Sequence, residues 1–93
     1  MTESIRLETP VLPNGFRLHW DKTRERHVLL FPEGAVALSP SAVEVLELCD
    51  GKRTIEDIAD ELSARFGGAD VHADVENLLI QLANRGMIVD ANA

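Results

Sequence analysis

Apolar and polar residues alternate strictly over residues 16–20, which is the pattern of a half-buried β-strand. Phe16, Leu18 and Trp20 fall on one face of this strand, and Arg17 and His19 fall on the other. The polar run at residues 21–26 then predicts a turn in the chain. We therefore expect a first strand that places its apolar face on a core.

Two further strands are predicted after that turn. Residues 27–31 carry apolar side chains at four successive positions, so this strand is either covered on both faces or lies where another element docks. Pro32-Glu33-Gly34 predicts a tight turn, and residues 35–38 form a short third strand whose partners the pattern leaves open. Together with the first strand they predict a small β element.

The first of three predicted helices begins at Ser39-Pro40. Serine is a good N-cap, and proline suits the first helical position because its missing N–H has no helical partner there. Gly51 occupies the position where a left-handed C-cap would end this helix, directly after Asp50.

The second and third helices show clear apolar stripes. Thr54 is the predicted N-cap of the second helix, and Gly67-Gly68 ends it. Asp70 or Asp74 is the predicted cap of the third, which Gly86 stops. The expected core stripes are Ile55, Ile58, Ala59, Leu62 and Phe66 on the second helix, and Val71, Val75, Leu78, Leu79 and Leu82 on the third.

Three strands followed by three helices predict a small α+β domain. We expect a winged-helix-like fold in which an N-terminal three-stranded antiparallel β element precedes three helices, as a single domain over residues 16–90. Residues 1–15 contain two prolines and an Asn-Gly pair, so they predict a flexible N-terminal segment without an element. Residues 87–89 either add a last short strand or simply cover the core.

Composition places this domain in a reducing compartment. The chain has 93 residues with one cysteine, Cys49, so it forms no internal disulfide, and a secreted domain of this size would usually need one. No stretch has the apolar length of a signal peptide or of a membrane span. We therefore expect a cytoplasmic protein that is not associated with a membrane.

The charge distribution disfavours nucleic-acid binding. The net charge is -7, and residues 32–93 hold four basic residues against twelve acidic ones. A DNA-binding winged-helix regulator is the alternative that the helical pattern permits. The predicted recognition helix, however, offers one arginine among acidic residues where basic side chains should face phosphates.

No catalytic or metal-binding set is apparent. His19, His27 and His72 lie on different predicted elements, and no cysteine or carboxylate completes a ligand spacing, although the first two could approach across the hairpin. Cys49 lies on the apolar stripe of the first helix, which predicts a buried small hydrophobe and not a nucleophile. We expect no metal, no cofactor and no enzymatic activity.

The third helix carries a second, mixed face. Ala73, Ile80, Ala83 and Met87 recur on it, with two asparagines among them. This face either packs under the hairpin or forms one wall of a groove. Residues 36–38 favour the groove, because a short strand with an unpaired edge can accept an added peptide strand.

Three segments of the chain resemble the PqqD family, the pyrroloquinoline quinone (PQQ) biosynthesis protein D. Residues 28–38 (VLLFPEGAVAL) are similar to its L-L-[YF]-P-E-G pattern, residues 46–54 (LELCDGKRT) to its L-C-D-G-x-R-T pattern, and residues 10–17 to its entry pattern. The likeness runs from about residue 10 to residue 89. The turn and cap residues within these motifs, such as Pro32 and Gly51, are expected to be structural.

The resemblance implies a peptide chaperone, a recognition element for ribosomally made and modified peptides. In that family the precursor peptide PqqA adds as a strand beside the third strand, against the third helix, and the radical SAM enzyme PqqE receives the complex. The residues and the charge, independently of the resemblance, predict no organic cofactor and no nucleic-acid partner. Whether a homodimer forms by exchange of the N-terminal hairpin stays an open question at this point. The peptide-binding residues carried over by element are Val36, Ala37, Leu38, Asn77, Ile80, Gln81 and Asn84.

Overall fold

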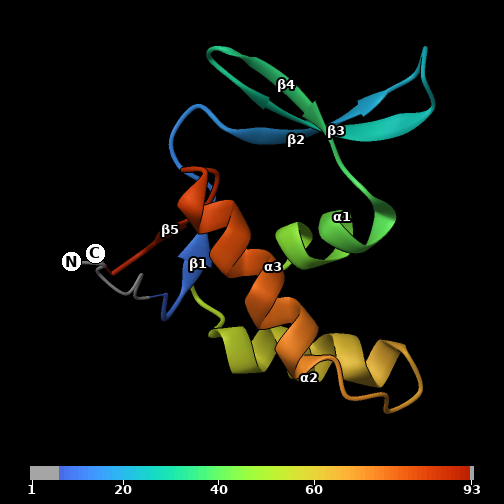
Figure 1. Ribbon diagram of the computed structural model, residues 1–93, viewed down its shortest axis with the longest axis vertical. Helices are drawn as coiled ribbons and strands as arrows, with labels where there is room; N and C mark the ends of the chain where they lie inside the picture. Colours follow the sequence, from blue (N-terminus) through green and yellow to red (C-terminus); the bar gives the residue numbers. More distant parts are fainter. Residues whose placement is uncertain (1–6, 93) are drawn as a thin grey trace.

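The computed structural model describes residues 7–92 and arranges them as a three-stranded sheet above three helices, with a small second sheet near the chain ends (Figure 1). The elements are β1 (Pro10–Val11), β2 (Arg17–Asp21), β3 (Arg26–Phe31), β4 (Gly34–Ala37), α1 (Pro40–Glu47), α2 (Ile55–Arg65), α3 (His72–Asn84) and β5 (Val89–Asp90). The predicted α+β class, with three antiparallel strands followed by three helices, is confirmed.

The larger sheet has the order β2-β3-β4, and both pairs of neighbours are antiparallel. Leu18, Leu29 and Val36 lie opposite one another across its three strands, so their side chains share one face. Leu29 is fully buried and Leu18 packs against the helical core. The alternation at residues 16–20 therefore predicted the inward position of Leu18 correctly, whereas Trp20, at the end of the same face, was expected in the core and is 47% exposed.

Helix capping agrees with the sequence at two of the three helix starts. The side chain of Ser39 accepts a hydrogen bond from the N–H of Ala42 at 3.2 Å, and Thr54 and Asp57 form a reciprocal capping box at the start of α2. The third helix starts at His72 with no side-chain cap from its N-cap residue, although Asp70 accepts a hydrogen bond from the N–H of His72 at 3.1 Å.

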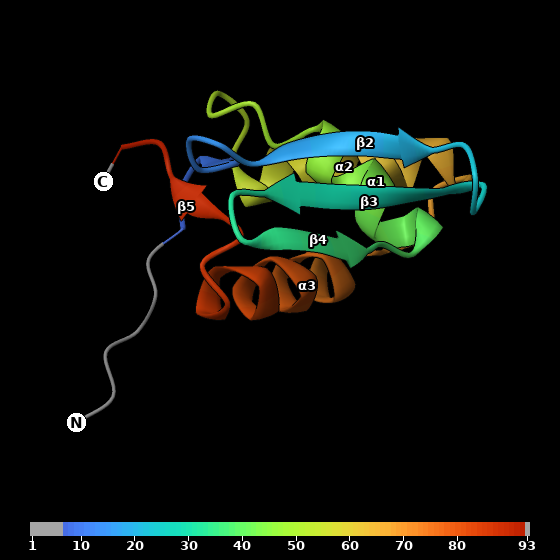
Figure 2. The same ribbon diagram turned by 90° about the horizontal axis from the view of Figure 1, so that it is seen from above.

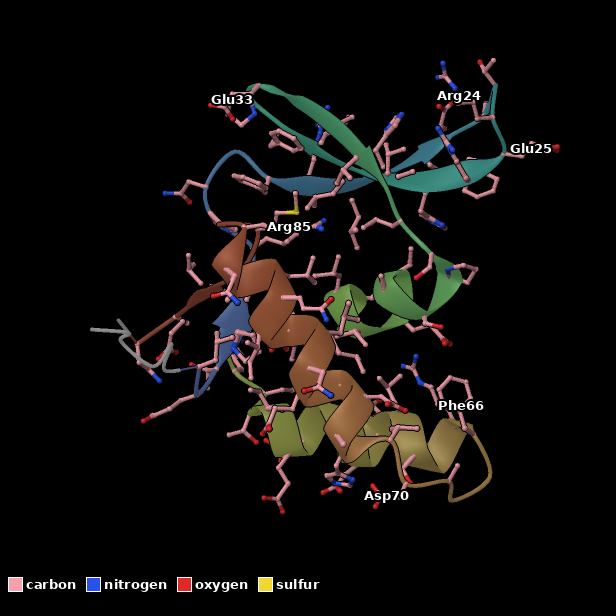
Figure 3. The ribbon with its side chains drawn as sticks, in the orientation of Figure 1. Arg24, Glu25, Glu33, Phe66, Asp70 and Arg85 are labelled. Atoms are coloured by element: carbon pink, nitrogen blue, oxygen red, sulfur yellow. The ribbon has the colours of Figure 1, made fainter. Side chains whose placement is uncertain are left out.

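The helices bury their predicted stripes with one exception. The core contains Ile58, Ala59, Leu62, Val75, Leu79 and Leu82. Phe66, which the stripe of α2 also included, is 50% exposed. The helix ends at Arg65, so Phe66 is its C-cap and projects beyond the region that α3 covers (Figure 3).

Helix α1 ends three residues earlier than the position of Gly51 predicts. Its last residue is Glu47, with Leu48 as C-cap. Gly51 instead shapes the connection to α2, with a φ of +78° that favours glycine, and its N–H donates to the carbonyl of Pro10 at 3.1 Å. The predicted left-handed conformation of Gly51 is therefore confirmed, but its predicted place at the end of α1 was wrong.

The expectation that no element precedes residue 16 was wrong. Strand β1 pairs antiparallel with β5, and Thr9 donates from its N–H and its hydroxyl to Asp90 Oδ1, each at 3.1 Å. Residues 87–89 both cover the core and begin this pairing, because Ile88 is buried and Val89 starts β5. A flexible segment over residues 1–15 and a domain over 16–90 stay predictions, and residues 1–6 lie outside the described part.

The histidines are not brought together. The side chains of His19 and His27 belong to opposite faces of the sheet, because His19 pairs with Val28 and His27 with Trp20, so their predicted approach was wrong. Within residues 7–92 no three His, Cys, Asp or Glu side chains gather to hold a metal ion. In the same described part, no helix combines the length and the apolar character needed to cross a bilayer.

Candidate functional site

Strand β4 is an edge strand. It pairs with β3 on one side, and within residues 7–92 no strand pairs with its other side. Seen from above, α3 lies beyond this outer edge, on the side away from β3 (Figure 2), and Figure 1 shows it in the layer below the sheet. The strand and helix that the sequence singled out therefore border the same side of the molecule.

The pairing register identifies which backbone groups of β4 are free. The N–H of Leu38 donates to the carbonyl of His27 at 3.1 Å, which makes these two residues a hydrogen-bonded pair. Backbone direction alternates along an antiparallel ladder, so Gly34 and Val36 also face β3, whereas the N–H and C=O groups of Ala35 and Ala37 point away from it. Two residues of β4 thus offer their backbone to an added strand.

The outer edge of β2 also lacks a partner among the described residues, but its composition differs. β2 carries Arg17, His19 and Asp21, whereas β4 consists of glycine, valine and two alanines. Charged side chains on an edge strand discourage pairing with another chain. The uncharged edge of β4 is therefore the better acceptor of an added strand.

The face of α3 that is not buried in the core supplies one apolar side chain among amides. Asn77, Gln81 and Asn84 are exposed, and Ile80 is 37% exposed. Their spacing of three and four residues places them on adjoining turns of the same side of the helix. These four residues are uncharged, and the exposed Glu76, four positions before Ile80, adds one carboxylate beside them. The surface therefore suits a ligand that supplies one apolar side chain and polar backbone or amide groups.

The second face of α3 proves to be divided between the two roles considered for it. Ala83 and Met87 are half-buried and pack against the core, as predicted for a face that lies under other elements. Ile80 and Ala73 stay exposed, as predicted for the wall of a binding site. Ala83 lies in the last turn of α3, and Met87 follows the end of the helix at Asn84.

The three predicted strand residues occupy different situations. Val36 and Leu38 are half-buried, their backbone N–H and C=O groups face β3, and Leu38 packs against the core. Ala37 is exposed and has free backbone groups. Ala35 has the same backbone orientation as Ala37, and the sequence analysis did not include it. The two-residue turn at Pro32-Glu33 could have identified it, because such a turn makes residues 31 and 34 a pair. That pair determines which of the following residues direct their backbone groups toward β3 and which direct them outward.

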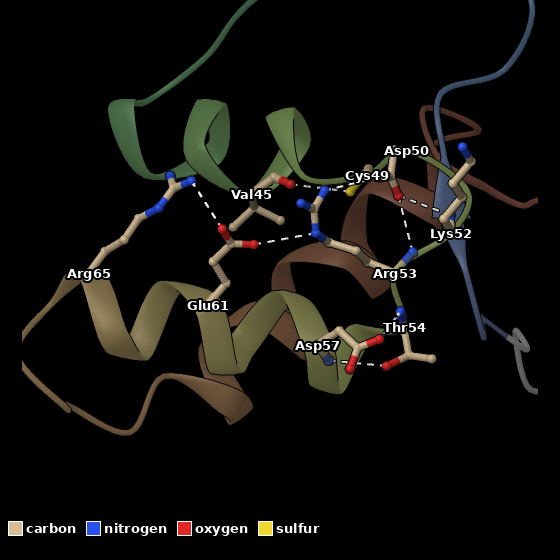
Figure 4. Close-up of polar contacts among 9 residues, drawn as sticks. All are labelled: Val45, Cys49, Asp50, Lys52, Arg53, Thr54, Asp57, Glu61 and Arg65. Carbon is tan, nitrogen blue, oxygen red and sulfur yellow. Dashed lines mark hydrogen bonds and ion pairs between the residues drawn. The ribbon is translucent and has the colours of Figure 1, made fainter.

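Residues of the second family-like motif form the connection between α1 and α2 (Figure 4). The carboxylate of Asp50 accepts hydrogen bonds from the N–H groups of Lys52 and Arg53 at 2.9 and 3.0 Å, and these bonds hold its pKa below the usual range. Arg53 also lies 3.0 Å from Asp50 and 3.3 Å from Glu61, which in turn contacts Arg65 at 3.6 Å. Asp50 and Arg53 of the motif therefore stabilise the connection between α1 and α2.

Cys49 in the same motif is buried, as predicted. Its Sγ donates to the carbonyl of Val45 at 3.3 Å. Burial, with a smaller contribution from the negative charge of Asp50, raises the pKa of the thiol to about 12. At neutral pH the sulfur is protonated, and a protonated thiol is neither a nucleophile nor a metal ligand.

Comparison with known proteins gives a consistent set of relatives. A family model described as coenzyme PQQ synthesis protein D (PqqD) matches residues 26–88. A PqqA binding protein of Rhodopseudomonas palustris (strain TIE-1) is 43% identical over 84 residues, which is 88% of this chain and 82% of that protein. Another from Rahnella aquatilis is 45% identical over 74 residues, with 78% of each chain covered.

Two solved structures resemble this fold. One is the solution structure of the PqqD truncation of Methylobacterium extorquens PqqCD, described as a functional, stand-alone recognition element for ribosomally made and modified peptides. Its TM-score is 0.72 at 38% identity, with 85% of this chain and 86% of that chain covered. The crystal structure of PqqD from Xanthomonas campestris has a TM-score of 0.55 at 34% identity, with 92% and 97% covered.

Proposed function

The chain belongs to the PqqD family, and from this membership we propose that it binds the precursor peptide PqqA in PQQ biosynthesis and presents it to the radical SAM enzyme PqqE. The observation that carries the proposal is the free, uncharged edge of β4 beside the exposed face of α3. In this proposal the protein catalyses nothing itself and acts in the cytoplasm.

Binding proceeds by strand addition. The peptide hydrogen-bonds to the outward N–H and C=O groups of Ala35 and Ala37, which fixes an extended conformation for whatever sequence it has. Alternate side chains of that strand then point toward α3, where Ile80 offers apolar contact and Asn77, Gln81 and Asn84 offer amide groups. Backbone pairing supplies affinity, and these few side chains supply selectivity.

Ile80→Asp tests this site directly. A carboxylate at an apolar anchor has to lose water without gaining a partner, so we expect the dissociation constant for PqqA to rise roughly ten- to a hundredfold. Isothermal calorimetry with synthetic PqqA measures it, and urea unfolding checks that the fold persists. Ile80→Ala, which removes contact without adding charge, should give a smaller loss.

Ala64→Asp is the matched control, because it adds the same carboxylate to an exposed position of α2, away from β4 and α3. Its affinity for PqqA should stay within about threefold of the parent. Equal binding by the parent, Ile80→Asp and Ile80→Ala, with all three folded, would place the peptide elsewhere.

The DNA-binding alternative has no comparable support. The chain carries a net charge of -7, and the exposed residues of α3 include Asp74 and Glu76. A homodimer formed by exchange of the N-terminal hairpin, β2 and β3, stays part of the proposal. Light scattering across a range of protein concentrations tests for it.

A further inference from the structure

Two surface hollows flank α1 on the side of the molecule where the β2-β3 turn lies. The first, of about 160 Å³, lies between α1, the end of α2 and the start of α3, and Phe66 is on its wall. The second, of about 600 Å³, lies between α1 and the end of the hairpin, where Trp20 and His27 contact each other edge to face with ring centroids 4.9 Å apart. Figure 3 shows Phe66 and Glu25, which lines the second hollow, on this same side.

This surface exposes large apolar side chains that are not buried in the core. Trp20 is 47% exposed and Phe66 50% exposed, so both are more open to solvent than Ile80 in the proposed peptide site. Glu44 lines both hollows, so the two adjoin the same side chain of α1. Large aromatic side chains left in solvent beside hollows are typical of protein interfaces and supply most of the binding energy there.

The charges around the hollows specify the partner's chemistry. Glu44 and Glu47 are three residues apart on α1, so they lie side by side and repel each other. Together the hollows are lined by four carboxylates, those of Glu25, Glu44, Glu47 and Asp74, against the one arginine, Arg26. None of these five side chains has an ion pair within residues 7–92, so the lining keeps an excess of negative charge. A lysine or arginine from a partner would relieve this repulsion and could lie against the ring of Trp20.

We propose that the hollows on either side of α1 form a docking surface for a partner protein that presents basic and apolar side chains on one segment. This inference rests on the proposed function and identifies the partner as the modifying enzyme, PqqE. Its basic groups pair with Glu44 and Glu47, and its apolar side chains fill the hollows beside Trp20 and Phe66.

The position of Leu38 would bring the bound peptide next to the docked enzyme. Leu38 follows the last residue of β4 and lines the hollow beside Trp20. A peptide strand paired along β4 therefore leaves the sheet next to the docked enzyme at one of its ends. The peptide site and the enzyme surface meet at Leu38, which belongs to both, whereas Glu44, Glu47 and Phe66 belong to the enzyme surface alone.

Two variants test the surface: the double charge reversal Glu44→Arg with Glu47→Arg, and Phe66→Ser. Calorimetry is run separately with PqqA alone and with PqqE. Both variants should weaken PqqE binding about tenfold or more, while the dissociation constant for PqqA stays within about twofold. Raising salt from about 50 to about 500 mM should weaken PqqE binding by the parent more than by the charge-reversed variant.

Glu56→Arg is the control, because it reverses an exposed charge at the other end of α2, about 15 Å along the helix from Phe66. It should bind PqqE like the parent. The proposal is overturned if both test variants bind PqqE as the parent does, or if the parent forms a dimer that the same variants dissociate, since a second copy would then occupy the surface.

The remaining outcomes separate this inference from the proposed function. A parent that binds PqqA but not PqqE would overturn presentation and this surface, and would leave peptide binding standing. A parent that binds PqqE through this surface but not PqqA would support the surface and overturn the proposed peptide site.

Discussion

His72, the first residue of α3, forms a polar link between two parts of the helical layer. Its Nδ1 lies 2.9 Å from Asp70 Oδ1 in the preceding loop, and its Nε2 lies 2.8 Å from Asp60 Oδ1 on α2. The hydrogen bond to Asp70 and then that to Asp60 raise the pKa of His72 above its usual value of 6.5. With both ring nitrogens donating, the charged imidazolium satisfies two carboxylates at once.

A pH dependence of stability follows from this link. A group whose pKa is raised by folding stabilises the native state fully below its unfolded pKa, and this contribution is lost as the pH rises through the folded pKa. We therefore expect His72→Gln to lower the free energy of unfolding more at about pH 5.5 than at about pH 8.5. Urea unfolding at the two pH values measures the difference, which should shrink in an Asp60→Asn background. An equal loss at both pH values would mean that the imidazolium does not hold the two elements together.

At the scale of single residues, the sequence predicted the contacts between residues that are close together in the chain. Ser39 and Thr54 were predicted as N-caps because a capping side chain accepts its hydrogen bond from an N–H only two or three positions later. The contact between His72 and Asp60 spans twelve positions and depends on how α2 packs on α3. No local pattern encodes that distance.

Strand β4 allows the backbone of the proposed site to be tested separately from its side chains. Proline at Ala37 removes an N–H that points to the free edge, and edge strands tolerate proline there. We expect Ala37→Pro to keep the fold but weaken PqqA binding by about five- to tenfold, because one strand-to-peptide hydrogen bond is lost and the ring crowds the edge. Calorimetry measures the affinity, and circular dichroism checks the fold.

Val36→Pro provides the contrast, because the N–H of Val36 faces β3 and takes part in the existing ladder. It should destabilise the sheet itself, by roughly 1 to 3 kcal/mol, because one ladder hydrogen bond is lost and its acceptor is left without a partner. If Ala37→Pro bound PqqA as tightly as the parent, strand addition along β4 would be ruled out.

Element prediction succeeded where periodicity was long enough to read. The three longer strands and the three helices were found, with boundaries shifted by a residue or two at most ends. The two-residue strands β1 and β5 were not found as a pair, since two residues carry no alternation and their pairing joins positions about 80 apart. Which residues of β4 face outward was also open, although the length of the turn before it determines this alternation.

Across the whole molecule, a single contact region joins the beginning, the middle and the end of the chain. β1 lies between β5 and the connection from α1 to α2, where Val11 bridges to Asp50 and Gly51 donates to Pro10. Pro10 is among the most deeply buried side chains. This region fixes the end of α3 and the start of α2 relative to each other, and so supports the helical layer that carries the candidate site.

The tightness of this region can be measured with a pair of glycine substitutions. Gly51 and Gly67 have similar φ values of +78° and +72°, so alanine at either position suffers similar backbone strain, about 1 kcal/mol. A Cβ at Gly51 would also lie 3.2 Å from Cβ of Ala91 and 3.5 Å from Val11, whereas a Cβ at Gly67 meets nothing within 4 Å. We therefore expect Gly51→Ala to lose roughly 1 to 3 kcal/mol more unfolding free energy than Gly67→Ala, as is typical of overpacking. Urea unfolding of the two variants measures this difference. Equal losses of unfolding free energy would show that β1 and β5 shift to accommodate the added methyl group, and that they do not hold the helices in place.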